Sequence, residues 1–242
     1  MPLISIIVPV FNEAGTVAAV LERLQVVPLP MDREILAVND GSTDGTREVL
    51  DRYAGVPGIT VIHAAQNGGK GSAIRAGLQV ASGDIVAIQD ADLELDPAQL
   101  ADLVRPILDG RADVVYGSRF LAGRPAAPWL TVLANRFLTA VTNLLYGSRV
   151  TDMETCYKVM RTGIARSLGL QASRFDIEPE ITAKLLRRGH RILELPVRFE
   201  PRSRAAGKKI GWRDGVTAVA VLIRHRFPTR RPSDSGAPAP PR

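Results

Sequence analysis

The first half of the chain alternates short, β-branched apolar runs with segments of helical periodicity, and this alternation restricts the fold more than any other feature. The apolar runs predict strands at 3–10, 34–38, 59–63, 84–89 and 113–116. Two helices between them are predicted by the spacing of Val17, Val20, Leu21 and Leu24, and of Ala73, Ala76, Gly77 and Val80. Strands that alternate with helices form parallel sheets. We therefore expect an α/β fold with a mostly parallel, Rossmann-like central sheet flanked by helices.

Three carboxylates, Asp90, Asp92 and Glu94, follow the fourth predicted strand. Ligands of an open parallel sheet bind at the carboxyl ends of its strands. Carboxylate oxygens are ligands that suit Mg²⁺ or Mn²⁺. A helix start, with Asp96 as N-cap before Pro97, explains Asp96 but neither Asp90 nor Asp92. The triplet therefore indicates a metal held against a bound phosphate, although the spacing of two aspartates alone is a weak signal.

Polar residues also follow the first and second predicted strands, at 11–13 and 39–45. Because these strand ends meet at one edge of the sheet, we expect a pocket there. Asp40 and Glu13 can accept hydrogen bonds from a base or a ribose. Asp44 is explained by a turn in which it caps the following helix.

The glycine-rich segment 66–72 stands at a predicted helix start and carries one cation, Lys70. Such a segment suits a phosphate group. It is not a Walker A loop, because Gly71 follows Lys70 where serine or threonine is required. An ATPase is therefore disfavoured.

Beyond Gly117 the pattern changes to amphipathic helices. One stripe consists of Leu130, Leu133, Phe137, Leu138, Val141, Leu144 and Leu145, and a second of Trp212, Val216, Val219, Ala220 and Ile223. Core packing explains both stripes. A basic end beside an apolar stripe is, however, also typical of a helix that lies in a membrane interface.

Composition favours one domain. The chain has 242 residues and a net charge of +6, and its single cysteine, Cys156, excludes an intrachain disulfide and favours a reducing compartment. The N-terminus lacks the features of a signal peptide, and no uncharged run reaches the roughly 18–20 residues that span a bilayer. We expect a catalytic domain at 1–227, with interfacial helices near 129–146 and 212–227, and a disordered tail at 228–242.

The motifs, taken in order, resemble family 2 glycosyltransferases of the GT-A fold, and within them the dolichol-phosphate mannose synthase branch. The resemblance covers about residues 3–227. It rests on Val8-Pro9-Val10-Phe11-Asn12-Glu13, Asn39-Asp40-Gly41-Ser42-Thr43-Asp44, Asn67-Gly68-Gly69-Lys70-Gly71, Asp90-Ala91-Asp92, Gly117-Ser118-Arg119-Phe120 and Thr151-Asp152-Met153-Glu154-Thr155-Cys156-Tyr157-Lys158.

This resemblance implies an inverting transfer of one hexose from a nucleotide diphosphate sugar, GDP-mannose or UDP-glucose, to a polyprenyl phosphate. The reaction is expected at the cytoplasmic face of a membrane, with the protein bound peripherally or through a membrane partner subunit. Mg²⁺ or Mn²⁺ would lie on Asp90 and Asp92, whereas Glu94 departs from the glutamine that relatives often carry. The implied donor site is Pro9, Val10, Asn12, Glu13, Asp40, Lys70, Asp90, Ala91 and Arg119.

The resemblance also implies which residues face the reacting groups. Arg119, together with the late basic residues Arg204, Lys208 and Lys209, would neutralise the leaving diphosphate and the acceptor phosphate. Asp92, Arg119 and Asp152 form the expected catalytic set. Asp152 resembles the aspartate that relatives use as a base toward hydroxyl acceptors. Because an acceptor phosphate is largely ionised near neutral pH, its second pKa being about 6, Asp152 would here only position the acceptor or the sugar.

Three alternatives remain at this stage. A family member acting on a non-lipid hydroxyl would need Asp152 as an essential base. A nucleotide-sugar-binding subunit without turnover would not need the acidic triplet or Arg119. A nucleic-acid binder is suggested only by the net charge and is disfavoured, because aromatic residues make up 5% of the chain and are not interleaved with the basic segment.

Overall fold

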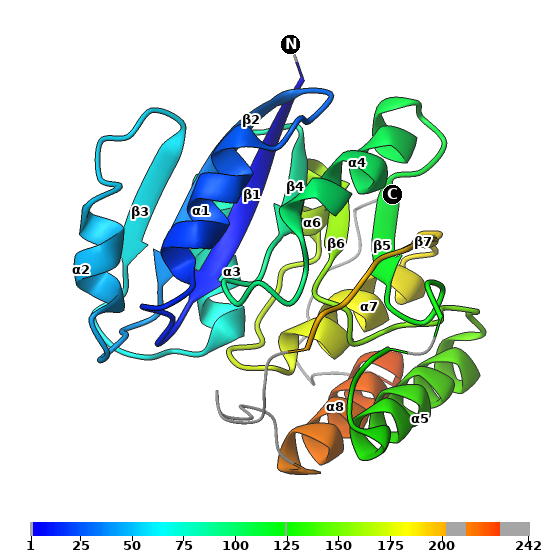
Figure 1. Ribbon diagram of the computed structural model, residues 1–242. Helices are drawn as coiled ribbons and strands as arrows, with labels where there is room; N and C mark the ends of the chain where they lie inside the picture. The colour runs from blue at the N-terminus through cyan, green and yellow to red at the C-terminus, as the bar shows by residue number, and fades with distance from the viewer. Residues whose placement is uncertain (1, 124, 202–211, 228–242) are drawn as a thin grey trace, which may run out of the picture.

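A central sheet organises the molecule (Figure 1). The computed structural model describes residues 2–123, 125–201 and 212–227, with 212–214 described through their backbone alone. The strands of this part follow the order β3-β2-β1-β4-β6-β5-β7 across the sheet. They are β1 (Leu3–Val10), β2 (Asp32–Asn39), β3 (Ile59–His63), β4 (Ile85–Ile88), β5 (Val114–Ser118), β6 (Lys158–Arg161) and β7 (Leu193–Pro196).

The predicted strands are confirmed, and the sheet is mostly parallel as expected. β1 pairs in parallel with β2 and β4, β2 with β3, and β5 with β7. β6 is antiparallel to both of its neighbours, β4 and β5. Neither β6 nor β7 was predicted, because each has four residues and carries a charged residue, Lys158 or Glu194, that interrupts the apolar pattern.

Helices cover both faces of the sheet because the chain reverses direction across it. From β1 to β3 the chain steps one way, and between β3 and β4 it crosses back past β1. Right-handed crossovers then put α1 and α2 on one face and α3 on the other (Figure 1). The helices are α1 (Val17–Val26), α2 (Thr46–Asp51), α3 (Lys70–Val80), η1 (Pro97–Gln99), α4 (Leu100–Leu108), α5 (Trp129–Tyr146), α6 (Thr162–Ser167), α7 (Ile177–Arg187) and α8 (Trp212–Arg226).

The main core lies between the sheet and these helices. All four predicted residues of the α1 stripe are buried, as are all residues of β4. On α3 the buried face includes Ile74 and Leu78, whereas Val80, predicted to face the sheet, is exposed. The close contact of α3 with the sheet depends on Gly77, because a Cβ there would lie 2.7 Å from Cγ2 of Ile7.

One edge of the sheet collects the polar motifs. The carboxyl ends of β1, β2, β4 and β5 meet there because these strands are parallel to one another. β6 begins at the same edge because it runs antiparallel, and Lys158 lies opposite Tyr116. The segment before β6 therefore meets the segment after β5, and the direction of the chain changes beside β1, which is where open α/β sheets bind ligands.

α5 and α8 pack together below this edge (Figure 1). The Tyr146 hydroxyl donates to the carbonyl of Leu222 at 2.7 Å, and Arg226 Nε donates to the carbonyl of Leu145 at 2.7 Å. A second, smaller core joins them to α7 through Leu138, Val150, Met153, Ala183, Ala218 and Leu222.

Core packing accounts for only part of the two predicted stripes. On α5, Leu138 is buried, but Leu133 and Phe137 are 58% and 59% exposed. On α8 the buried residues are Ala218 and Leu222, and the predicted stripe residues Val216 and Ile223 face outward. Each helix can bury only a narrow stripe because the second core is small. The side chain of Trp212 lies outside the described residues.

Candidate active site

Side chains of the first two motifs form hydrogen bonds that join the carboxyl ends of β1 and β2. Asn12 donates its backbone N–H to Ser42 Oγ at 3.0 Å and accepts the N–H of Thr43 on Oδ1 at 2.8 Å. The N–H of Glu13 is bound by Thr46 Oγ1 at 2.8 Å. Asn12 has a φ of 55°, a conformation that asparagine tolerates better than most residues. The first motif therefore forms a fixed wall at the carboxyl end of β1.

Asp40 connects this wall to the glycine-rich segment. Its buried carboxylate accepts the N–H of Gly68 on Oδ1 at 2.9 Å and that of Gly69 on Oδ2 at 2.7 Å. Its own N–H binds the carbonyl of Val10 at 2.8 Å. Both carboxylate oxygens thus already hold the segment that the sequence assigned to a phosphate. Gly69 has a φ of 91°, which favours glycine at this point.

Lys70 forms a bridge between two carboxylates. Its ammonium lies 2.8 Å from Asp90 Oδ1 and 2.8 Å from Glu178 Oε1. Burial lowers the pKa of Lys70, but the charges of Asp90 and Glu178 more than offset this and hold it well above its ordinary value. Burial likewise acts to raise the pKa of Asp90, and Lys70 brings it below its ordinary value. The charges of Lys70 and Asp90 are therefore both present at neutral pH.

The acidic triplet turns sharply after β4. Leu93 has a φ of 63°, and the N–H of Glu94 donates to Asp92 Oδ1 at 3.2 Å. Ala91 is buried, so it offers the site only its backbone. The N-cap predicted at Asp96 is confirmed, since its carboxylate accepts the N–H of Ala98 at 3.1 Å.

Asp90, Asp92 and Glu94 do not form a ready-made site with three metal ligands. Among the described residues, no group of three or more His, Cys, Asp or Glu side chains is gathered to hold a metal ion. Mg²⁺ is commonly bound by one or two carboxylates together with substrate phosphates and water. The oxygen donors of Asp90 and Asp92 at the sheet edge fit that mode.

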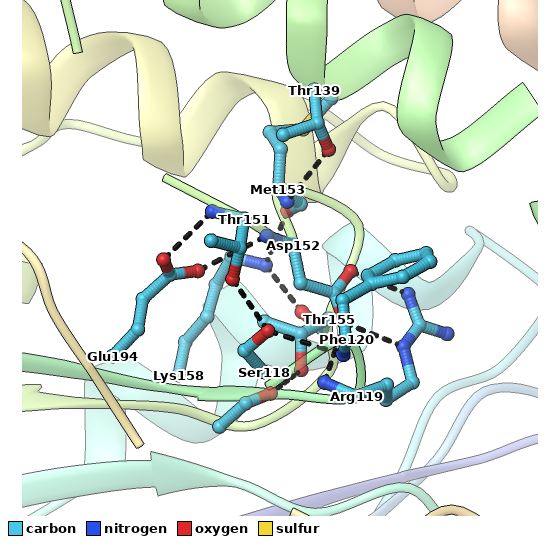
Figure 2. Close-up of polar contacts among 11 residues, drawn as sticks. Ser118, Arg119, Phe120, Thr139, Thr151, Asp152, Met153, Thr155, Lys158 and Glu194 are labelled. Atoms are coloured by element: carbon cyan, nitrogen blue, oxygen red, sulfur yellow. Dashed lines mark hydrogen bonds and ion pairs between the residues drawn. The ribbon is translucent and has the colours of Figure 1, made fainter. Parts of the chain in front are cut away.

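Arg119 and Asp152 are joined by three hydrogen bonds (Figure 2). Arg119 Nε lies 2.7 Å from Asp152 Oδ2 and Nη2 lies 2.8 Å from Oδ1, and the backbone N–H of Arg119 adds a third bond to Oδ2 at 3.0 Å. Asp152 is fully buried. Burial lowers the pKa of Arg119, but the hydrogen bonds and charge of Asp152 raise it above its ordinary value. The ring of Phe199 lies 5.4 Å from the guanidinium carbon.

A shell of polar groups holds this pair in position (Figure 2). Glu194 accepts the N–H of Thr151 at 2.7 Å and that of Asp152 at 3.0 Å. The hydroxyls of Ser118 and Thr151 lie 2.6 Å apart. Glu194 was not identified from the sequence, because it lies on β7, a short strand that was not predicted. The only sign of it in the sequence is a single carboxylate placed between two apolar residues, Leu193 and Leu195.

Two charged residues of the last motif, the buried Lys158 and the half-buried Glu154, adjoin the pair. Lys158 donates to the carbonyls of Met153, at 3.0 Å, and of Thr155. Burial lowers the pKa of Lys158, although Glu178 and Glu154 act against this. Burial, and then the charge of Glu178, raise the pKa of Glu154 to about 7. Of the late basic residues expected at the site, Arg204, Lys208 and Lys209 lie outside the described residues.

The motifs at the sheet edge lie within a segment that matches a known protein family. A family model described as Glycosyl transferase family 2 matches residues 5–169, which span β1 to the end of α6. The chain belongs to glycosyl transferase family 2. Every motif on which the sequence resemblance rests lies in this range.

This family 2 glycosyltransferase has relatives that carry the names of polyprenyl-phosphate sugar transferases. It is 31% identical to undecaprenyl-phosphate mannosyltransferase of Micrococcus luteus, over 89% of this chain and 90% of that protein. It is 26% identical to polyprenol monophosphomannose synthase of Mycolicibacterium smegmatis, over 85% and 80%. It is also 26% identical to dodecaprenyl-phosphate galacturonate synthase of Rhizobium johnstonii, but it spans only 61% of that protein. The named sugars therefore differ among the relatives.

The fold of the family 2 glycosyltransferase is also that of a solved enzyme. Glucosyl-3-phosphoglycerate synthase from Mycobacterium tuberculosis, in complex with Mn²⁺, UDP and glucosyl-3-phosphoglycerate, superposes with a TM-score of 0.71. The likeness covers 93% of this chain and 80% of that one at 20% identity. It confirms the expected GT-A fold.

Proposed function

We propose that this protein transfers a single hexose, mannose or glucose, from a nucleotide diphosphate sugar to a polyprenyl phosphate, with inversion at the anomeric carbon and with Mg²⁺ or Mn²⁺ as cofactor. The relatives from Micrococcus and Mycolicibacterium support the lipid-phosphate acceptor through their names. The Mn²⁺ and UDP bound in the solved neighbour support the cofactor and the kind of donor.

The state of Asp152 is the observation that carries the choice of acceptor. A hydroxyl acceptor requires a base that can reach it and take its proton. Asp152 is fully buried and accepts three hydrogen bonds from Arg119, two through the guanidinium and one through the backbone. It is therefore a positioning residue for Arg119 and not an available base. An acceptor that arrives already ionised, as a phosphate does, needs no base.

On the donor side, the proposal assigns the nucleoside to the wall made by Pro9, Val10, Asn12 and Glu13. Asp40 shapes this wall through the glycine-rich segment. Asp90 and Asp92 would hold the metal, which when bound supplies positive charge to the leaving diphosphate. Lys70 adds a second, fixed positive charge beside Asp90.

Arg119 is the residue proposed to act on the reacting groups. Asp152 engages Nε and Nη2, which leaves the Nη1 edge of the guanidinium for a phosphate oxygen. A guanidinium already held in place loses little freedom when it binds an oxyanion. An acceptor phosphate oxygen would then form the bond to the anomeric carbon from the face opposite the leaving group. The bond from that carbon to the nucleotide diphosphate breaks, and the diphosphate departs with the electron pair.

The paired helices α5 and α8 are proposed to bring this centre to the lipid surface. Exposed large apolar side chains gather there: Trp129, Leu130, Leu133, Phe137, Leu144, Val216, Ile223 and Phe227. Arg136, Arg149, Arg224 and Arg226 are also exposed in this region, as suits a surface with anionic lipids. Thr139 on α5 binds the N–H of Met153, next to Asp152, so this layer adjoins the reaction centre (Figure 2). None of the described helices is long and apolar enough to cross a bilayer. The cytoplasmic face and a partner subunit stay predictions.

A donor panel tests the reaction. Purified protein with Mg²⁺ or Mn²⁺ is given a polyprenyl phosphate in detergent and either GDP-mannose or UDP-glucose, and released nucleotide and sugar-bearing lipid are both measured. We expect lipid product with one donor and its loss after removal of the metal with EDTA. Release of nucleotide without lipid product would contradict the acceptor, and absence of turnover with every donor would favour a binding subunit.

A further inference from the structure

Two buried carboxylate oxygens beside the Lys70 bridge have no hydrogen-bond donor. In the described part of the chain, four buried side-chain nitrogen or oxygen atoms lack a partner, and two of them are Glu154 Oε1 and Glu178 Oε2. The others, Arg75 Nε and Thr162 Oγ1, belong to separate segments. Glu178 is 7% exposed at its side chain and begins α7, whereas Glu154 precedes β6. Two elements distant in sequence thus bring together acceptors that no described residue satisfies.

The fold does not need these oxygens to be carboxylates. Leaving a buried polar group unpaired costs about 1–3 kcal/mol, and more if it is charged. The nearby cation Lys158 supplies no hydrogen bond to these oxygens, because it donates to the carbonyls of Met153 and Thr155. Glu178 uses only Oε1 on Lys70. A cost of this kind is offset when a ligand supplies the missing donors.

The two glutamates are connected to both halves of the proposed reaction centre. Glu178 is joined through Lys70 to Asp90, on the donor diphosphate side. Glu154 lies within electrostatic reach of both Glu178 and Arg119, the residue proposed to hold the phosphate oxygens. The group that passes between diphosphate and acceptor is the sugar, so a sugar bound for transfer is the ligand that can bring hydroxyl donors to these oxygens.

We infer that Glu154 Oε1 and Glu178 Oε2 accept hydrogen bonds from hydroxyls of the transferred sugar and thereby select a neutral, hydroxyl-rich hexose over a uronic acid. The inference rests on the proposed function and specifies its substrate. Hydroxyls donate hydrogen bonds, whereas the carboxylate of a uronic acid only accepts them and would meet two acceptors. A site built to bind hydroxyls discriminates strongly against a ligand that cannot supply them. The relative from Rhizobium, named for galacturonate, indicates that the sugar is not fixed by the family.

Binding measurements without turnover test this assignment. The affinities of UDP, UDP-glucose, UDP-glucuronate, GDP and GDP-mannose are measured by calorimetry in Mg²⁺ for the wild type and for Glu154→Gln, Glu178→Gln and the double variant. Each single change is expected to weaken the preferred nucleotide hexose about tenfold, while the matching free nucleoside diphosphate changes less than about twofold. The double variant is expected to lower the preference for hexose over glucuronate further, because glutamine amides can donate to a carboxylate.

Glu180→Gln is the matched control. Glu180 is equally buried on α7, but its carboxylate is fully paired with the N–H groups of Gln171 and Ala172 and with Lys184. It is expected to leave the ratio of hexose to nucleoside diphosphate affinity unchanged. Circular dichroism establishes that each variant is folded.

The outcomes separate this inference from the function on which it rests. Unchanged hexose affinity in both folded single variants would overturn the inference alone, as would an equal loss of affinity for hexose and free nucleotide. A fall in kcat with unchanged donor affinity and KM in Glu154→Gln would also overturn it, by assigning Glu154 to proton transfer. Failure of the wild type to bind any of these nucleotides or nucleotide sugars would overturn the proposed function and the inference together.

Discussion

Every residue of β4 is buried and helices cover both faces of the sheet, whereas α5 and α8 turn Leu133, Phe137 and Ile223 outward. At the sheet edge, buried charges are held by fixed partners, as in the bridge of Lys70 and the pair of Arg119 with Asp152. In the α5–α8 layer, by contrast, apolar side chains of the described residues are exposed. The sheet edge thus holds charges in a fixed geometry, whereas the α5–α8 layer exposes an apolar surface of the kind that marks interaction sites.

The largest effect is expected from changing a charge at the sheet edge. Asp92→Asn removes a proposed metal ligand and is expected to lower kcat/KM about a hundredfold or more, while the protein stays folded and still binds liposomes. Rates of lipid-linked sugar formation test this, with exposed Asp102→Asn as the control. Asp152→Asn is expected to retain more activity than Asp90→Asn. Equal loss in both, in folded proteins, would restore Asp152 as a base.

Substitutions at two neighbouring residues of α8 are expected to affect stability very differently. Leu222 is fully buried in the second core, and Ile223 beside it is exposed. Leu222→Ala is expected to lower the free energy of unfolding by about 2–4 kcal/mol, and Ile223→Ala by about 0.5 kcal/mol or less. Urea unfolding followed by circular dichroism measures both. Similar costs for the two changes would contradict the orientation of α8.

The outward face of α5 supports the next prediction. Replacing Leu133 and Phe137 together by serine is expected to reduce partitioning onto liposomes with anionic lipid about tenfold, because each side chain loses apolar area that would enter the interface. Nucleotide binding is expected to be unchanged. Val26→Ser, at an exposed position on α1, serves as the control in the same flotation assay. If the double variant floats as well as the wild type, the exposed face of α5 does not bind the lipid surface.

The smallest effect concerns pH and is confined to the sheet edge. The pKa of Glu154 is raised to about 7 in the folded protein from an ordinary 4.5, so the folded state binds the proton more tightly than the unfolded state. Stability is therefore lost as pH rises from about 4.5 through 7. Glu154→Gln cannot ionise, so its stability relative to the wild type should increase by on the order of 1 kcal/mol between about pH 5 and pH 6. Thermal unfolding at both pH values tests this, and parallel pH profiles would contradict it.

The sequence predicted what depends on periodicity and on strand ends. The five strands with apolar runs, both long helices and the gathering of Asp40, Asp90 and Arg119 at one edge follow from such patterns. It did not predict β6 and β7, since pairing with neighbours and not local pattern makes them strands. It left the stripes of α5 and α8 open between core packing and a membrane interface, because periodicity states which residues share a face and not what covers that face.

Within the site, the sequence indicated which residues stand at the sheet edge but not which residues they contact. Lys70 was expected on a phosphate and is held between Asp90 and Glu178. Asp40 was expected on a nucleoside and binds the N–H groups of Gly68 and Gly69. These partners come from segments far apart in the chain, so only the folded arrangement reveals them.

The antiparallel course of β6 has a consequence for how this molecule can vary. The segment from Arg119 to Asp152 leaves the sheet and returns to it at the same edge, and its two ends are joined to each other by an ion pair. The entropy of closing a loop rises only slowly with loop length. Changes in the length of helix α5 are therefore expected to leave the register of the strands unaltered. The helix proposed to face the acceptor can in this way differ between proteins that share the same sheet.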